Sequence, residues 1–409
     1  MSRAELAEAV NEYLWRTTGL RRDLDAHAIA RYERGVVRWP NSDYRRALGH
    51  ILCASDAELG FVPARRHKPA GISPDRALAV NLFSPFGRSP EYISSEFVGR
   101  WAGRIGKTEV DAIRAATRTA ASTENLHGGG SSSGTAHQAL TQFAPMVKCT
   151  VSANLRRSLF EAVGNLSSVV GYTAFDAGEL TDADRYFQFA LWCADAAGSW
   201  DLRASSLADM ARRAAFVGDP DNALSLIELA QVRSDRLTFT IRAMLSAMRA
   251  QYLTAIGHTE EALAEVARAD DMFAARTPEA EPPWMCYYDT AEHLGSTGKA
   301  LALAAVASNS IDIAAPRLLD AVNLHSSEYP RSRAFSQIRL ATLTMQLGDP
   351  RQAAAIGTEA IGHARGLKSA RISTELRRLA MTAGRHRSIT VVRELRELIS
   401  TASLSNSSS

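Results

Sequence analysis

The stretch Gly178-Glu-Leu-Thr-Asp-Ala183 recurs in three related forms: Gly218-Asp-Pro-Asp-Asn-Ala223, Gly257-His-Thr-Glu-Glu-Ala262 and Gly348-Asp-Pro-Arg-Gln-Ala353. Each form places alanine five residues after glycine. The first three glycines are 40 and then 39 residues apart, and the fourth follows after about two further periods. Glycine can end a helix in a left-handed conformation, acidic residues favour the start of the next helix, and a small alanine lets two helices approach closely. The pattern therefore predicts repeated pairs of antiparallel helices.

The composition also favours an all-α fold. Alanine recurs at helical spacing after residue 99, and runs of Val, Ile and Thr with a period of two are nearly absent. Hydrophobic residues make up 46% of the chain and charged residues 22%, close to the globular average, so wholesale disorder is excluded. A chain of 409 residues exceeds what one core usually serves, so we expect two or more units.

We expect the repeated helix pairs to occupy residues 138–403. The repeats resemble the tetratricopeptide repeat, although their period exceeds the roughly 34 residues of that family. An ordinary alanine-rich helical bundle is the alternative, but repetition at four sites favours an α-solenoid. A stacked array needs an atypical last helix, and residues 386–402 suit this role because one face carries four apolar residues: Ile389, Val392, Leu395 and Ile399. Residues 404–409 are expected to form a disordered tail.

Three further segments precede the array. Residues 1–62 are predicted to form short helices, and residues 63–98 a linker, because prolines and glycine interrupt any helical period there. Residues 99–137 are predicted to hold one helix followed by the stretch 128–134, which reads GGGSSSG. Such a composition is typical of a flexible linker, and we therefore expect a loop at 128–134 that separates this segment from the array.

Several function classes find no support in the sequence. The four cysteines are far apart and show no metal-ligand spacing, which predicts neither disulfides nor a metal site and agrees with a cytoplasmic protein. No apolar run is long enough for a membrane span. The motifs GxSxG and HExxH and a phosphate-binding Gly-Lys-Ser/Thr loop are absent, so we expect neither an enzyme nor a cofactor.

The first helix is predicted to begin with a capping box formed by Ser2 and Glu5. A second helix is expected from Asp25 to Gly35, with Ile29 and Tyr32 on its inner face. Its outward face then carries three side chains that can contact a partner: His27, Arg31 and Arg34.

These two helices resemble the Cro/repressor-like (XRE) helix-turn-helix family. Ser2–Ala7 matches the family's Ser-Gln-Glu-Glu-Leu-Ala-like helix, and Ile29–Gly35 matches its Ile-Ser-Arg-Trp-Glu-Arg-Gly-like recognition helix. The resemblance implies that Arg3 meets backbone phosphate and that Asp25, His27 and Ala28 begin the recognition helix that faces base edges. It further implies that three arginines contact phosphate or bases: Arg31, Arg34 and Arg38. We interpret Glu33 as a structural residue.

In this family another helix precedes the matched pair, and the sequence has no counterpart to it ahead of Met1. The connection between the matched helices, Asn11 to Leu24, is also longer than the usual tight turn. We therefore expect the apolar residues Leu6 and Val10 to be exposed unless another part of the chain covers them.

Most of the chain resembles an actinobacterial architecture in which such a reader, the stretches Trp39-Pro40 and Asp56–Phe61, a Gly-Gly-Gly loop and a tetratricopeptide-like array occur together. The resemblance implies a homodimeric transcription regulator that binds double-stranded DNA and whose array dimerises or senses a peptide or small molecule. The alternative is a repeat scaffold that binds a protein or peptide and no DNA. The net charge of +3 lies at the N-terminal end, since residues 1–69 hold 12 Lys/Arg against 9 Asp/Glu and the remainder holds 35 of each.

One aromatic cluster can be interpreted in two ways. It can line a ligand groove, or it can belong to the core, as aromatic residues on a repeat helix usually do. Its members are Tyr186, Phe187, Phe189 and Trp192.

Overall fold

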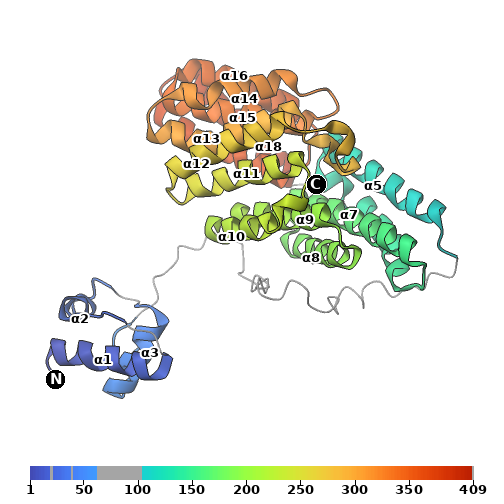
Figure 1. Cartoon of the computed structure of the whole chain (residues 1–409). Helices are drawn as coiled ribbons and strands as arrows, with labels where there is room; N and C mark the ends of the chain where they lie inside the picture. Colours follow the sequence, from blue (N-terminus) through green and yellow to red (C-terminus); the bar gives the residue numbers. More distant parts are fainter. Residues whose placement is uncertain (19–21, 38–39, 62–103, 408–409) are drawn as a thin grey trace. The chain divides into compact units, whose positions relative to one another are not determined.

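The computed structural model describes residues 1–18, 22–37, 40–61 and 104–407 (Figure 1). Within these ranges the chain forms 17 α-helices, a few short 3-10 turns and no strand, which confirms the all-α prediction. Two compact units are present, unit 1 (Met1–Ala79) and unit 2 (Val80–Ser409). No described helix is both long and apolar enough to cross a membrane. The predicted linker 63–98 and the side chain of Arg38 lie outside the described residues.

Unit 1 contains the helices α1 (Arg3–Thr18), α2 (Ala26–Glu33) and α3 (Ser42–Leu52). The capping box forms as predicted, since the Ser2 N–H donates to the Glu5 carboxylate (2.7 Å) and the Glu5 N–H donates to Ser2 Oγ (3.3 Å). The helix then continues well past Asn11, so α1 takes up about half of the predicted long connection. Asn11 also anchors the chain that leads to α2, because its side chain makes two hydrogen bonds with the Leu24 backbone (2.8 and 2.9 Å).

The apolar face of α1 is covered from within unit 1. Val10 is fully buried, Leu14 is 2% exposed, and Leu6 packs partly buried against the same core. The cover comes from α2, α3 and the segment that follows, chiefly through Ile29, Leu48 and Phe61. Of the two expected alternatives, the structure shows the second: another part of the chain covers Leu6 and Val10, and these side chains help to close a small core.

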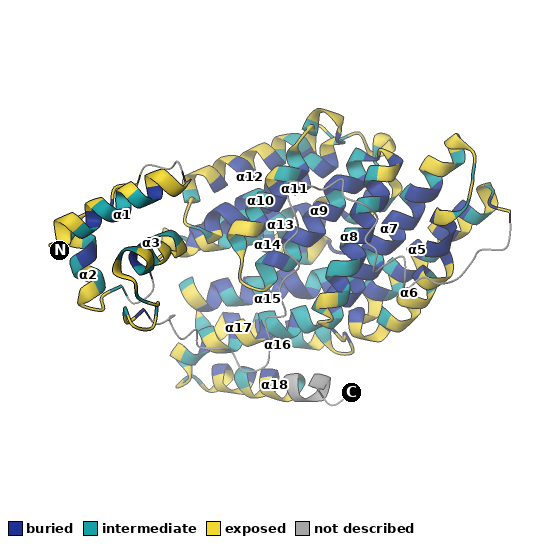
Figure 2. Ribbon diagram, turned by 90° about the horizontal axis from the view of Figure 1, so that it is seen from below, coloured by how far each residue is buried: buried dark blue, intermediate teal, exposed yellow. Residues whose placement is uncertain are grey.

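Unit 2 is built from fourteen described helices: α5 (Lys107–His127), α6 (Gly129–Phe143), α7 (Ala153–Ala177), α8 (Leu180–Ala197), α9 (Trp200–Phe216), α10 (Pro220–Gln231), α11 (Phe239–Ala255), α12 (Thr259–Ala274), α13 (Thr290–Ala307), α14 (Ala315–Leu324), α15 (Pro330–Leu347), α16 (Pro350–Ala364), α17 (Ala370–Ala383) and α18 (Thr390–Ser407). Each helix from α7 to α15 packs against the next. The odd-numbered helices from α7 to α17 also contact one another in sequence, so they form one continuous row, here called the inner row. Figure 2 shows that buried residues are concentrated along α7, α8, α9 and α11.

The repeated glycine–alanine pattern has the predicted physical basis at three of its four sites. Gly178, Gly218 and Gly257 have φ values of 93°, 89° and 96°, a conformation that favours glycine. Gly348 differs, because its φ is −117° and its backbone is extended. All four alanines are at most 2% exposed and sit where paired helices meet: Ala183, Ala223, Ala262 and Ala353.

The prediction of a flexible loop at 128–134 is wrong, because α6 begins at Gly129. The Gly129 N–H donates to Asp176 Oδ2 (2.9 Å), so a buried carboxylate occupies the start of the helix, where negative charge is favourable. A Cβ on Gly129 would lie 2.2 Å from the Thr173 carbonyl oxygen. Glycine is therefore needed for close packing, and the predicted boundary between residues 137 and 138 falls inside α6.

The same glycine stretch brings the two ends of unit 2 together. The Gly130 N–H donates to the Lys368 carbonyl (2.9 Å), and the Lys368 N–H donates to the His127 carbonyl (3.0 Å). In addition, α5 contacts α15 and α7 contacts α17. The row of helices is thus closed on itself, although nothing in the sequence pattern predicts this closure.

The last helix and the aromatic cluster match their predicted roles. Val392, Leu395 and Ile399 on α18 are at most 2% exposed and pack with α15, α16 and α17, as expected of a terminal covering helix. The helix continues through Ser407, beyond the predicted end at 403. Tyr186 and Phe187 belong to the main core, so the core interpretation of the aromatic cluster is confirmed.

Candidate nucleic-acid interface

Helix α2 presents a polar outer face from a firmly anchored backbone. Ile29 is 2% exposed and fixes the inner side of the helix in the core of unit 1. His27, Arg31 and Arg34 are all exposed, as predicted from their spacing. Gly35, at φ 67°, ends this helical segment. The face therefore offers one imidazole and two guanidinium groups, side chains that can donate hydrogen bonds to phosphate or to base edges.

The structure brings Arg3 to the end of α2. Its Nε lies 2.7 Å from Glu33 Oε2, and the two side chains are 58% and 47% exposed. An exposed ion pair of this kind contributes little to stability because water screens it. Arg3 thus lies on an exposed surface together with the basic residues of α2. Its ion pair with Glu33 would compete with a contact to a DNA phosphate.

Two of the residues predicted to contact DNA have structural roles in unit 1. The carboxylate of Asp25 accepts the Ala28 N–H (2.7 Å) and so caps the start of α2. Ala28 is partly buried and packs against the core of unit 1, because it lies next to Ile29 on the inner side of the helix. The contact of Ala28 with DNA stays a prediction.

Several other arginines of unit 1 are engaged within the protein and are therefore less available to contact DNA. Arg34 Nε donates to the Ala30 carbonyl (3.1 Å), which holds part of its side chain along α2. Arg22 pairs with Asp43 (3.1 Å), and Arg45 pairs with Asp56. The side chain of Arg31 makes no hydrogen bond or ion pair with any residue in the described part of unit 1, so among the predicted arginines that the structure describes its guanidinium is the most available.

Unit 2 contains a buried ionic network that sequence reasoning missed. Arg331 on α15 pairs with Glu124 on α5 and lies 3.1 Å from Asp176 on α7. Asp176 is fully buried and also accepts the Ser369 hydroxyl (2.8 Å). Burial raises the pKa of Glu124 to about 7, against the opposing influence of Arg331. Arg331 is 207 residues from Glu124 and 155 residues from Asp176 in the chain, so no local motif predicts these pairs.

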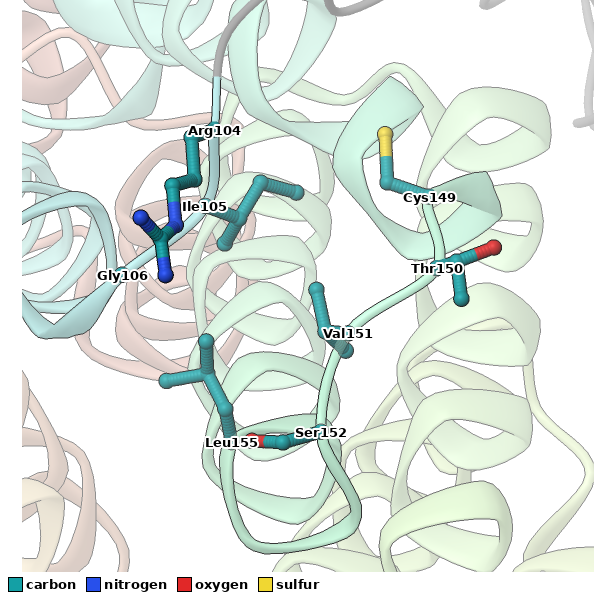
Figure 3. Close-up of a pocket in the computed structure, with 8 residues that line it drawn as sticks. All are labelled: Arg104, Ile105, Gly106, Cys149, Thr150, Val151, Ser152 and Leu155. Atoms are coloured by element: carbon teal, nitrogen blue, oxygen red, sulfur yellow. The ribbon is translucent and has the colours of Figure 1, made fainter.

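A surface pocket of about 520 Å³ lies beside the start of α5. Figure 3 shows Arg104 on one wall and Cys149 on the opposite wall. Its lining residues are Arg104, Ile105, Gly106, Cys149, Thr150, Val151, Ser152 and Leu155. Among the described residues, neither a carboxylate nor an imidazole lines this pocket. Among the residues described here, no group of His, Cys, Asp and Glu has the arrangement of a metal site.

Comparison with known proteins gives no match to a protein family, to a curated protein or to a solved structure.

Proposed function

We propose that this protein is a DNA-binding transcription regulator, in which unit 1 is a helix-turn-helix reader and unit 2 an α-solenoid of tetratricopeptide-like helix pairs. One observation carries the proposal: α2 exposes His27 and Arg31 on one face while Ile29 anchors the opposite face in the core. A helix fixed in this way can enter the major groove and direct side chains to base edges without losing its own packing.

Two features support the same reading. Arg3 lies beside the last residue of α2, where it can meet a phosphate once Glu33 releases it. The turns and buried alanines of unit 2 agree with the repeat pattern, and the covering helix α18 agrees with the end of a stacked array. A homodimer would present two such readers to two half-sites.

The test is a salt titration of DNA binding by the full chain, using the region upstream of its own gene. We expect affinity to fall steeply as salt rises, because phosphate contacts release counterions. Arg31→Ala should weaken binding, whereas Arg16→Ala should leave it unchanged, since Arg16 is exposed on α1 and pairs with Glu12 within the same helix. Equal affinities for both variants and the wild type would reject α2 as the reader.

The second candidate is a scaffold that binds a peptide or protein and no DNA. It is favoured by the engagement of Arg3, Arg22 and Arg45 with carboxylates, which offsets three of the positive charges in the described part of unit 1. Absence of salt-dependent DNA binding by the full chain would place this candidate first.

A further inference from the structure

Three basic side chains project from successive helices of the inner row. Lys299 lies on α13, Arg339 on α15 and Arg371 on α17. All three are partly exposed although they lie deep among the helices. We call them the interior basic group.

Aromatic rings hold the two arginines close together. The guanidinium carbons of Arg339 and Arg371 lie 5.2 and 4.9 Å from the centroid of the same Phe335 ring. Arg371 also donates a hydrogen bond to the Tyr172 hydroxyl (2.6 Å). Cation–π contacts and this hydrogen bond therefore fix two like charges near each other, in an arrangement that repulsion alone would disfavour.

The nearby carboxylates pair only loosely with these cations. Glu375 lies 3.7 Å from Arg339 Nε, a distance too long for a hydrogen bond, and the Nε atom is buried with no hydrogen-bond partner. Arg371 lies 3.8 Å from Asp176, but Asp176 is closer to Arg331. The side-chain amine of Lys299 makes no hydrogen bond or ion pair with the residues that the structure describes.

The surroundings of Lys299 disfavour its charged form, first through burial and then through the neighbouring arginines. Burial lowers the pKa of its amine to about 7; the positive charges of Arg339, Arg371 and Arg378 act in the same direction, and Glu375 opposes them. Buried charges without partners are costly, so an added anion would be strongly favoured here.

We propose that the interior basic group binds a small-molecule anion, whose carboxylate or phosphate group is held by the Lys299 amine and the guanidinium groups of Arg339 and Arg371. Guanidinium groups offer planar pairs of donors that suit such oxygens, and the lysine adds a compact charge. The partial exposure of all three side chains leaves a surface that a small ligand can reach. The proposal that an anion binds here depends only on these contacts. The proposal that the bound anion is a regulatory signal rests on the proposed function.

The experiment is a calorimetric titration of the full chain at pH 8 with two probes, inorganic phosphate and succinate. Each titration is run in two buffers with different ionisation enthalpies, so that proton uptake can be measured. We expect saturable binding with uptake of close to one proton, because the anion drives protonation of Lys299. The probe that binds more tightly identifies the favoured anionic group.

Two lysine variants complete the test. Lys299→Met should lower the affinity at least tenfold and abolish the proton uptake, while its folding should persist because the change removes an unpaired charge from the interior. Lys107→Met is the matched control: Lys107 is exposed at the start of α5, so this variant should bind as the wild type does. Absence of binding by either probe, or equal binding by Lys299→Met and the wild type, would overturn the proposal.

The outcomes separate this site from the DNA reader. Anion binding without any DNA binding would retain the interior site and reject the regulator. DNA binding without anion binding would retain the reader and reject the interior site.

Discussion

Arg331 on α15 donates a hydrogen bond to Glu124 on α5 across a sequence separation of 207 residues (2.8 Å), inside the protein. With Asp176 on α7, these two side chains join the first helices of unit 2 to its last helix pairs. The closure of the array therefore depends on buried charges as well as on the glycine stretch at 128–130.

Replacing Arg331 with alanine should destabilise unit 2 strongly. Removal of the cation leaves Glu124 and Asp176 buried without it, and breaking a buried pair in this way typically costs about 3–5 kcal/mol. Urea unfolding followed by circular dichroism would measure the loss. Arg114→Ala is the control, because Arg114 and Asp111 form an exposed pair (45% and 52%) that should contribute less than about 1 kcal/mol. Similar losses in both variants would contradict the closing role of Arg331.

Two glycines of α6 should respond in opposite directions to alanine. Gly129→Ala places a Cβ 2.2 Å from a backbone oxygen of α7, which should cost roughly 1–3 kcal/mol or more. Gly134→Ala meets no atom within 4 Å in the same helix and should stabilise unit 2 by about 0.5–1 kcal/mol through helix propensity. Thermal melts of both variants test this, and a tolerated Gly129→Ala would refute the close contact.

The titration of Glu124 should contribute to the pH dependence of the free energy of unfolding. Its folded-state pKa is about 7 and its unfolded-state value is near 4.5, so the folded state binds more protons between these pH values. Stability must then fall as pH rises from about 4.5 to about 7. The free energy of unfolding of Glu124→Gln should lack this contribution, so the wild type should lose stability relative to the variant across that window. Parallel pH profiles from urea unfolding would show that Glu124 does not titrate in this way.

The Arg3–Glu33 pair should affect DNA binding more than stability. Arg3→Ala should weaken binding and lower the salt dependence by about one phosphate contact, while melting changes little because the pair is exposed. Glu33→Ala should strengthen binding, since it frees Arg3 and removes a negative charge from the surface. Fluorescence anisotropy with labelled DNA measures both. The prediction requires that the two variants change the DNA affinity in opposite directions. A change in the same direction for both variants would contradict it.

Local sequence signals predicted the starts and ends of several helices. The capping box at Ser2, the cap at Asp25 and the glycine–alanine turns act over a few residues, so they can be read without knowledge of the fold. The same holds for α18, whose apolar spacing predicted its buried face. The outward position of Arg31 followed from helical periodicity.

Tertiary structure decided what those helices meet. The stretch 128–134 has the composition of a linker, yet it forms a helix because Asp176 and Thr173 lie against it. The cover of Val10, the inward position of Ala28 and the grouping of Lys299 with Arg339 and Arg371 likewise depend on residues from separate helices. Side chains brought together by packing share no sequence spacing. The sequence by itself therefore determined most of the helices but not α6, and only the closed array decided which charges became buried partners.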